Sequence, residues 1–290
     1  MNPLFAKAIG AMLGLAFVLL CFALLYFEFQ WQQIGFFLVG VTGAIFANST
    51  GAGGGVVFIP LFDFLGFSEP QSLATSFGIQ SYGMTAGAIT WWCHYKIQTS
   101  AVPHPTTQAE WQPLPTLIAI AALASVAGIW LNFSLVLASP AGLLDTFRVF
   151  SIFLGICILT TARRMRGDSV RTEIEGIDYG VVALLAFGGG VITAWLSVGV
   201  GEIVAFYLIF RRYNTTLAIA VAVIVTAVTV WSVAPINFGA NSQIYWQLVA
   251  FAGPGAVVGG ITARVLVNSM SPIGLKIFFG VWLLFVGIVG

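Results

Sequence analysis

The chain alternates long apolar stretches with short polar breaks, and the apolar stretches have the length of membrane helices. No charged residue occurs between Glu28 and Asp63, nor between Arg212 and Arg264. Both intervals exceed the roughly 20 apolar residues that cross a bilayer as a helix. The pattern predicts an all-α, polytopic helical membrane protein with apolar helical segments at 6–28, 34–48, 55–66, 70–93, 111–133, 142–163, 179–196, 202–212, 214–235, 244–266 and 272–290.

One pattern occurs twice along the chain, and each copy contains a glycine cluster next to a short apolar segment. The clusters are Ser49-Thr50-Gly51-Ala52-Gly53-Gly54-Gly55 and Ser197-Val198-Gly199-Val200-Gly201-Glu202. Aligning them pairs Ser49 with Ser197, and the match returns later, where Pro140 and Gly142 pair with Pro272 and Gly274. A duplicated membrane unit with interrupted segments is typical of secondary transporters.

The duplication predicts one integral membrane domain built from two inverted repeats. We assign 1–30 to an N-terminal transmembrane helix, 31–170 to the first repeat and 171–290 to the second repeat. Each repeat holds an odd number of segments, so the second copy enters the membrane from the opposite face. With the N-terminus cytoplasmic and the C-terminus extracytoplasmic, the outer loops hold no Lys or Arg, as the positive-inside rule requires.

Three of the segments beside the glycine clusters, 34–48, 55–66 and 202–212, are too short to cross the membrane, whereas 179–196 is nearly full length. As helices, residues 34–48 reach about 22 Å and residues 55–66 about 18 Å, against a hydrocarbon core of roughly 30 Å. The glycine turns should therefore lie at membrane depth. Each turn is expected to open a short helix, at Gly55 and at Glu202, with its N-terminus aimed at the midplane. Unpaired N–H groups at helix N-termini favour an anion.

We predict that the two turns form one dehydrated, donor-rich site for a small oxyanion. Glycines let the backbone approach a ligand, and hydroxyl and amide side chains add donors. The candidate substrate-binding residues are Asn48, Ser49, Thr50, Gly51, Gly53, Gly54, Gly55, Thr75, Ser76, Ser197, Gly199 and Gly201.

Other roles for these residue types stay open. Glycines also serve helix packing, which is the role we expect for the scattered Gly35, Gly40 and Gly259. Serine and threonine hydroxyls often bond back to their own helix.

Glu202 is the only acidic residue in the second cluster, and it lies where the first cluster has Gly54. An intramembrane carboxylate is a candidate for proton coupling. The alternative is that Glu202 caps its own helix N-terminus. Because an ionised Glu202 would repel an anion, coupling requires that the carboxylate be protonated for part of the cycle.

The composition argues against other function classes. Charged residues make up 7% of the chain and the mean hydropathy is +0.99, which excludes an ordinary soluble domain. No basic run is interleaved with aromatic residues, so a nucleic-acid partner has no support. Cys21, Cys93 and Cys157 lack metal-ligand spacing, and we expect no metal and no cofactor. His94 and His104 flank a predicted cytoplasmic loop, away from any intramembrane nucleophile, which argues against an intramembrane enzyme.

These motifs resemble the TauE/SafE family of membrane proteins, also grouped as sulfite exporters. The resemblance rests on the run from Gly51 to Pro60 and on Leu73-Ala74-Thr75-Ser76, and it extends over nearly the whole chain after residue 30. The second copy departs from the pattern, with Leu208 in place of Pro60 and Ile219-Ala220 in place of Thr75-Ser76.

The resemblance implies a transporter in the bacterial plasma (inner) membrane that exports sulfite, a sulfonate or a related anion. Alternating access around the two turns is the expected mechanism, and a homo-oligomer is left open. An anion channel is the alternative, because paired helix N-termini at the midplane also build anion pores.

Overall fold

The chain folds into a bundle of α-helices. The computed structural model describes residues 3–27, 31–100, 105–139, 141–164, 171, 173–269 and 271–289. Its helices are α1 (Pro3–Tyr26), α2 (Gln32–Thr50), α3 (Gly55–Phe64), α4 (Glu69–Ser100), α5 (Pro105–Trp111), α6 (Leu114–Leu135), α7 (Leu143–Arg164), α8 (Gly176–Leu196), α9 (Val200–Phe210), α10 (Thr215–Ser232), α11 (Ala234–Asn237), α12 (Trp246–Ser269) and α13 (Pro272–Val289).

The predicted fold class is confirmed. Each predicted apolar segment is a helix, and α5 and α11 are additional short helices between these segments. Within the described residues, seven helices are long and apolar enough to cross a membrane, by length and composition. One of them is the 19-residue α2, so the prediction that segment 34–48 is too short is wrong for this helix. The described residues form no strand. The chain is therefore an all-α, multi-span membrane protein.

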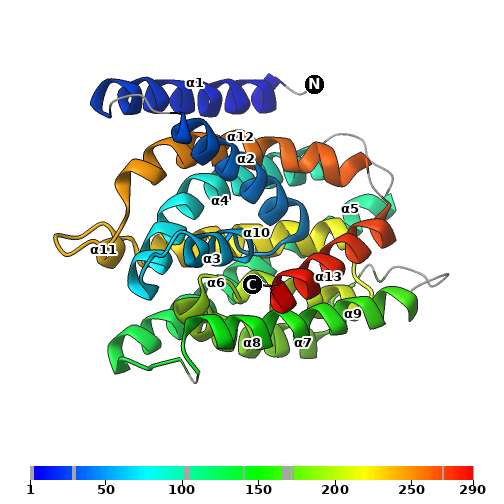
Figure 1. Cartoon of the computed structure of the whole chain (residues 1–290). Helices are drawn as coiled ribbons and strands as arrows, with labels where there is room; N and C mark the ends of the chain where they lie inside the picture. Colours follow the sequence, from blue (N-terminus) through cyan, green and yellow to red (C-terminus); the bar gives the residue numbers. More distant parts are fainter. Residues whose placement is uncertain are drawn as a thin grey trace.

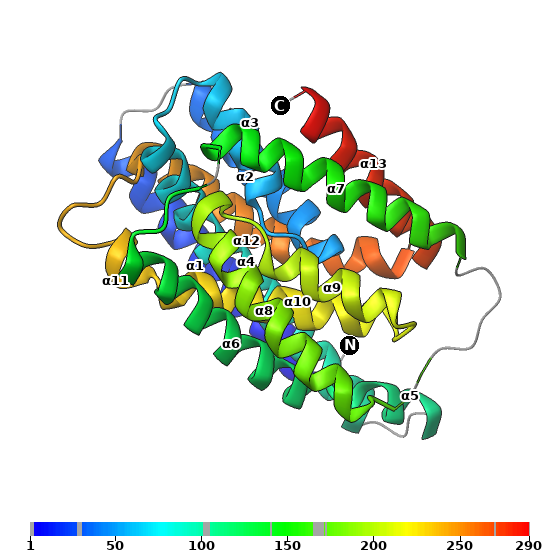
Figure 2. The same cartoon turned by 90° about the horizontal axis from the view of Figure 1, so that it is seen from below.

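The helices lie alongside one another in layers around a central pair, α4 and α10 (Figure 1). On one side α2 and α12 cover this pair, and α1 lies outside α12 (Figures 1 and 2). On the other side α6 packs against α8. The helices α7 and α13 pack along each other and contact elements of both repeats. Residues 217–227 of α10 are all buried, which places this helix in the core of the bundle.

Each of the main helices packs against a helix of the other repeat, and equivalent helices have equivalent partners. The alignment relates α2 to α8, α6 to α12, α4 to α10 and α7 to α13. In the structure α2 packs against α12 and α8 packs against α6, whereas α4 packs against α10 and α7 against α13. Such an exchange is expected when a two-fold axis relates two halves. The inverted orientation of the halves stays a prediction.

Glycines bring the backbones of α2 and α12 into contact. A Cβ atom on Gly40 would lie 1.9 Å from the carbonyl oxygen of Ala252, and one on Gly259 would lie 2.2 Å from that of Val41. Small residues allow this close approach of membrane helices. The expected packing role is thus confirmed for Gly40 and Gly259, whereas a Cβ on Gly35 would meet open space.

The two glycine clusters interrupt helices inside the bundle. α2 ends at Thr50 before α3 begins at Gly55, and α8 ends at Leu196 before α9 begins at Val200. With 10 and 11 residues, α3 and α9 reach about 15 Å and 16 Å, roughly half of the hydrocarbon thickness. Neither α3 nor α9 is therefore long enough to cross the membrane by itself.

The helix ends refine the repeat alignment at the turns. Gly51 and Ser197 are the equivalent residues, because each is the left-handed C-cap of its helix, with φ 82° and 58°. This equivalence is shifted by two residues from the pairing of Ser49 with Ser197. The prediction that Glu202 opens the second short helix is also wrong by two residues, because α9 begins at Val200 with Gly199 as its N-cap.

Candidate functional site

The two glycine turns lie against each other in the interior of the bundle. A Cβ atom on Gly201 would lie 2.2 Å from the carbonyl oxygen of Gly51, and a Cβ on Gly55 would lie 2.7 Å from that of Ser197. Residues far apart in the sequence are thus in backbone contact, one turn from each repeat. Side chains at these positions would push the turns apart.

Glu202 joins the two turns through its carboxylate. The side chain is fully buried. Its Oε1 accepts a hydrogen bond of 2.7 Å from the N–H of Gly53, and its Oε2 accepts one of 2.8 Å from the N–H of Gly199. The carboxylate therefore caps its own helix, α9, and also binds the N-terminal end of α3.

The hydrogen-bond partners of this carboxyl group are backbone N–H groups. No basic side chain in the described part of the chain forms an ion pair with Glu202. Instead, the N-terminal ends of α3 and α9 supply N–H donors and their partial positive charge. A buried charge needs such partners because water does not reach it. The two turns thus hold the carboxyl group of Glu202 between the N-terminal ends of α3 and α9.

Gln80 of α4 links the same two turns from the side. Its Oε1 accepts a hydrogen bond of 3.0 Å from the N–H of Gly54. Its Nε2 lies 2.7 Å from Ser197 Oγ, 3.0 Å from the Ser197 carbonyl oxygen and 3.1 Å from Ser76 Oγ. Ser197 Oγ also donates to Ser76 Oγ at 2.9 Å. The sequence analysis did not single out Gln80, which is one of two glutamines in the predicted apolar segment 70–93.

Some of the predicted site residues bond elsewhere. The hydroxyls of Ser49 and Thr50 both donate to the carbonyl oxygen of Phe46, at 3.1 and 2.8 Å. The amide of Asn48 donates at 2.8 Å to a carbonyl one turn back in its own helix. Thr75 accepts from a backbone N–H just before α12 at 3.0 Å. The direct contacts between the turns therefore involve the glycines, Ser76, Ser197 and Glu202 among the predicted residues.

Two buried oxygens on α2 and α10 have no partner among the described residues. They are Thr226 Oγ1 on α10 and Asn48 Oδ1 on α2. A Cβ atom on Gly201 would lie 2.5 Å from Thr226 Oγ1, so this hydroxyl is next to the second turn. Buried polar groups are rarely left unpaired, and a hydroxyl in this place is a donor available to an oxyanion.

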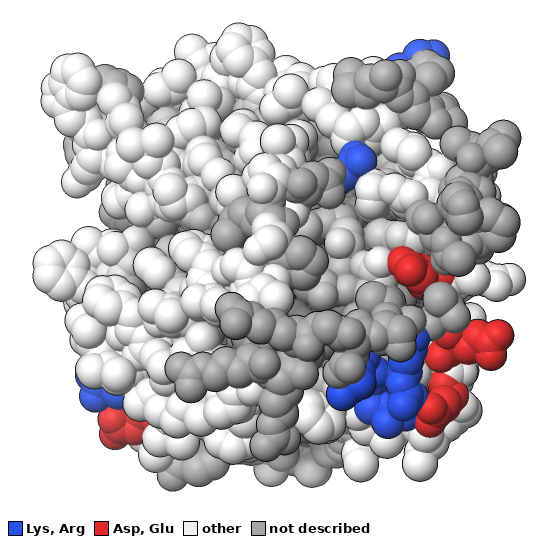
Figure 3. All heavy atoms as spheres, turned by 90° about the vertical axis from the view of Figure 1, so that its right-hand side faces the viewer, with Lys and Arg blue, Asp and Glu red and all other residues white. Residues whose placement is uncertain are grey.

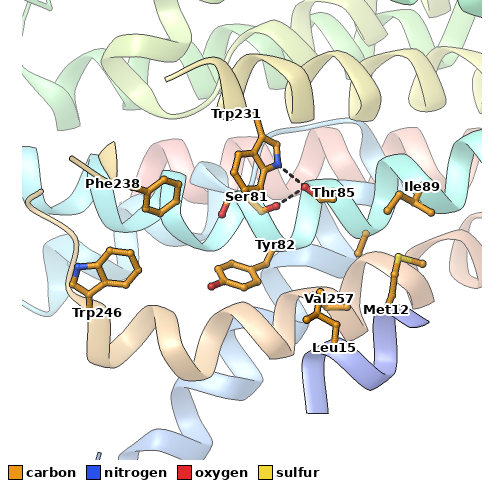
Figure 4. Close-up of a pocket in the computed structure, with 11 residues that line it drawn as sticks. Met12, Leu15, Ser81, Tyr82, Thr85, Ile89, Trp231, Phe238, Trp246 and Val257 are labelled. Atoms are coloured by element: carbon orange, nitrogen blue, oxygen red, sulfur yellow. Dashed lines mark hydrogen bonds between the residues drawn. The ribbon is translucent and has the colours of Figure 1, made fainter. Parts of the chain in front are cut away.

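A large and mostly apolar pocket lies on another face of α4 (Figure 4). It has a volume of about 500 Å³ and lies between α1, α4, α10 and α12. Most of its lining is apolar. Two of its polar side chains bond to the protein: Trp231 Nε1 donates to Thr85 Oγ1 at 2.7 Å, and Ser81 Oγ donates to the Gly78 carbonyl at 2.7 Å. Helical spacing places Ser81 and Thr85 away from the Gln80 face of α4. This pocket is not suited to an anion.

His94 is buried inside α4, which differs from the predicted loop position. The helix continues to Ser100, beyond the apolar stretch that ends at Cys93. The imidazole packs edge-on against Trp91 and Trp111, and within the described ranges no nucleophilic side chain bonds to it. His104 lies outside the described residues. Nor do the described residues include a group of three or more side chains that could hold a metal ion.

Comparison with known proteins agrees with this architecture. The family model described as "Sulfite exporter TauE/SafE" matches residues 36–289 of the chain. No curated protein and no solved structure gives a match. The matched range includes nearly all of both predicted repeats, both glycine turns, Gln80 and Glu202. The chain therefore belongs to the sulfite exporter TauE/SafE family of membrane transport proteins.

Proposed function

We propose that the chain is a secondary transporter that exports sulfite, an organosulfonate or a related sulfur oxyanion across the bacterial plasma membrane. Membership of the sulfite exporter family and the multi-span helical fold support this function. The observation on which it depends most is the position of Glu202, whose carboxylate accepts N–H bonds from Gly53 and Gly199. A carboxylate between two helix N-termini occupies the kind of place that an oxyanion takes.

In this proposal the Glu202 carboxylate and the cargo anion compete for the same N–H groups. Protonation removes the negative charge of Glu202 and weakens its bonds to the turns, since charged acceptors form the stronger hydrogen bonds. The N–H groups of Gly53 and Gly199 then become available to the cargo. The hydroxyls of Ser76, Ser197 and Thr226 are further donors nearby. Separation of the two turns would open the site toward one side of the membrane at a time.

An anion channel is the second candidate function. The turn residues are buried and their backbones touch, and this close packing favours a carrier that opens in steps over a continuous pore. Flux into proteoliposomes of sulfite, sulfate, thiosulfate and short organosulfonates tests both candidates. Saturable flux that responds to counter-flow is expected of a carrier. Conductance that rises linearly with concentration would instead indicate a channel.

Glu202→Gln tests the role of the carboxylate. The amide keeps the size of the side chain and cannot ionise, so we expect anion flux to lose its pH dependence while anion binding stays largely intact. Flux and binding would be measured in proteoliposomes over a range of pH. If the variant keeps the full pH response, the carboxylate is only a helix cap and coupling lies elsewhere.

Glu69→Gln is the matched control. The carboxylate of Glu69 accepts a backbone N–H bond of 3.0 Å from Leu143 at the start of α7, but it is exposed and away from the turns. This variant should keep the pH response of the parent.

A further inference from the structure

Arg264 of α12 is a partly buried cation that no carboxylate balances. Its side chain is partly buried, and its Nε is buried without a hydrogen-bond partner. In the described part of the chain Arg264 forms no ion pair. The groups that it influences electrostatically include Cys93 and His94 of α4, and neither is a carboxylate. A partly buried guanidinium without a partner is costly, and a bound anion would remove this cost.

Phe5 of α1 holds the guanidinium group in place. The guanidinium carbon of Arg264 lies 4.8 Å from the centroid of the Phe5 ring. The face of an aromatic ring attracts a cation, but it offers no oxygen acceptor for the N–H groups of that cation. The ring therefore positions Arg264 and leaves it able to bind an anion. Because α1 lies outside both predicted repeats, this contact has no counterpart in the duplicated unit.

The three helices that meet at this place carry only basic residues toward their predicted cytoplasmic ends. These residues are Lys7 of α1, Lys96 of α4 and Arg264 of α12, and the only acidic residue of the three helices is Glu69, at the opposite end of α4. The residues outside the described ranges that adjoin these ends also include no Asp or Glu: 1–2, 101–104 and 270. Figure 3 shows this end of the bundle, and in its upper part, at the level of α1 and α12 in Figure 1, the coloured atoms are basic and none is acidic.

Arg264 lies at the depth where phospholipid headgroups begin. The helix α12 starts at Trp246, which we expect at the outer interface, since aromatic residues gather there. Arg264 is about 27 Å further along this helix. This distance is close to the roughly 30 Å of the hydrocarbon core, so the guanidinium is near the inner interface.

An apolar surface runs from Arg264 toward the middle of the membrane. Ile261 and Val257 lie three and seven residues before Arg264, so they share its face of α12. Both belong to one apolar cluster with Met12 of α1. The apolar pocket of Figure 4 begins there, with Met12 and Val257 at one of its ends. Val257 is about 10 Å from Arg264 along the helix, which is within the roughly 15 Å depth of one leaflet.

We propose that Arg264 binds the phosphate group of an anionic phospholipid in the cytoplasmic leaflet, with an acyl chain along α12 toward the apolar pocket. Guanidinium groups bind phosphate oxygens through their N–H groups, and the phosphate supplies the partner that Nε lacks. Basic sites between membrane helices on the cytoplasmic side suit anionic headgroups. The apolar surface beside Arg264 favours a lipid over a free anion, because only a lipid gains from contact with it.

Arg264→Gln tests the proposal, because the amide stays polar but carries no charge. The full chain in neutral detergent would be titrated with short-chain phosphatidylglycerol and with short-chain phosphatidylcholine, and bound lipid would be counted by native mass spectrometry. The parent should prefer phosphatidylglycerol. Arg264→Gln should bind phosphatidylglycerol about ten-fold more weakly and should lose this preference.

The thermal midpoint separates a lost lipid from a damaged fold. Without added lipid, Arg264→Gln should be at least as stable as the parent, since no carboxylate loses its partner. Added phosphatidylglycerol should raise the midpoint of the parent and leave that of the variant nearly unchanged. Arg171→Gln is the matched control, because it removes the same charge on the predicted cytoplasmic side from a residue that pairs with Glu175. This control should bind phosphatidylglycerol as the parent does.

Three results would overturn the proposal. The first is equal binding of both lipids by the parent, and the second is unchanged binding of phosphatidylglycerol by Arg264→Gln. The third comes from calorimetry with sodium sulfite and sodium phosphate: if Arg264→Gln loses the binding of these anions and keeps that of phosphatidylglycerol, Arg264 serves a free anion. Lipid binding is measured without transport, so the result is independent of the role of the glycine turns.

Discussion

Gln80 and Glu202 together satisfy backbone N–H groups that the two turns leave without helical partners. Gln80 accepts from Gly54, while Glu202 accepts from Gly53 and Gly199. Inside a bilayer no water replaces a lost partner, so each unsatisfied group has a full energetic cost. Gln80 and Glu202 therefore stabilise the two turns by accepting these backbone hydrogen bonds.

Gln80→Leu should destabilise the protein and lower its flux. The substitution removes the acceptor for the Gly54 N–H and the donor to Ser197, at a cost of about 1–3 kcal/mol. The thermal midpoint in detergent and anion flux in proteoliposomes would measure the two effects. Gln98→Leu on the same helix is the control, because Gln98 makes only a 3.5 Å contact with His94. Equal midpoints for the two variants would contradict the role given to Gln80.

Gly53→Leu should abolish transport while the protein still inserts into the membrane. A Cβ on Gly53 would lie 3.1 Å from the Ser197 carbonyl oxygen and 3.2 Å from Gln80 Oε1, so the longer side chain must separate the turns and break the bond to Glu202. Flux and membrane insertion would be compared with Gly188→Leu, where a Cβ meets open space. Unchanged flux in Gly53→Leu would rule out the turns as the site.

For single residues, the sequence was enough to identify a side chain whose charge is unusual in an apolar segment. Glu202 is an isolated carboxylate in an apolar segment, so its importance could be inferred without a structure. Gln80 could not be inferred in this way, because one neutral amide on a helix rich in Ser, Thr and Gly has no distinctive spacing. The side-chain directions of Ser49, Thr50 and Thr75 also depend on helix rotation, which composition does not fix.

The helices α2 and α12 pack so closely that their interface leaves no space for larger side chains. Gly259→Leu should therefore destabilise the bundle by roughly 1–3 kcal/mol or more, because its Cβ would meet the Val41 backbone at 2.2 Å. Gly35→Leu, also in this helix pair but with open space at its Cβ, should leave the thermal midpoint nearly unchanged. Similar thermal midpoints for the two variants would show that the interface between α2 and α12 can accommodate the larger side chain.

Element boundaries were predictable where apolar runs end at glycine or charge, and less so elsewhere. The breaks after Thr50 and Leu196 follow from the glycine clusters. The C-terminal end of α4 was placed too early, because the helix extends past its apolar part to Ser100. That error put His94 in a loop, whereas the helix buries it between two tryptophans. Amphipathic ends of long helices give no clear signal in hydropathy alone.

For the whole molecule, the halves 31–170 and 171–290 are predicted to be related by a two-fold axis in the membrane plane. The absence of Lys and Arg from the predicted outer loops places the N-terminus inside and the C-terminus outside. In a variant without the native cysteines, Ser68→Cys and Ser242→Cys should react from the outside with a membrane-impermeant thiol reagent in whole cells. Glu173→Cys should react only after the membrane is opened. The reverse labelling pattern would overturn the predicted orientation.

The single carboxylate between the two turns determines how the membrane potential acts on export. An ionised Glu202 and a bound monoanion beside a protonated Glu202 place the same net charge in the bundle. In the proposed cycle a monoanion that crosses with one proton is electroneutral, so the potential does no work on it. A dianion that crosses with one proton moves one negative charge outward, which an interior-negative potential favours by about 2.3 kcal/mol per 100 mV. The protonation state of the cargo would then decide whether voltage drives its export.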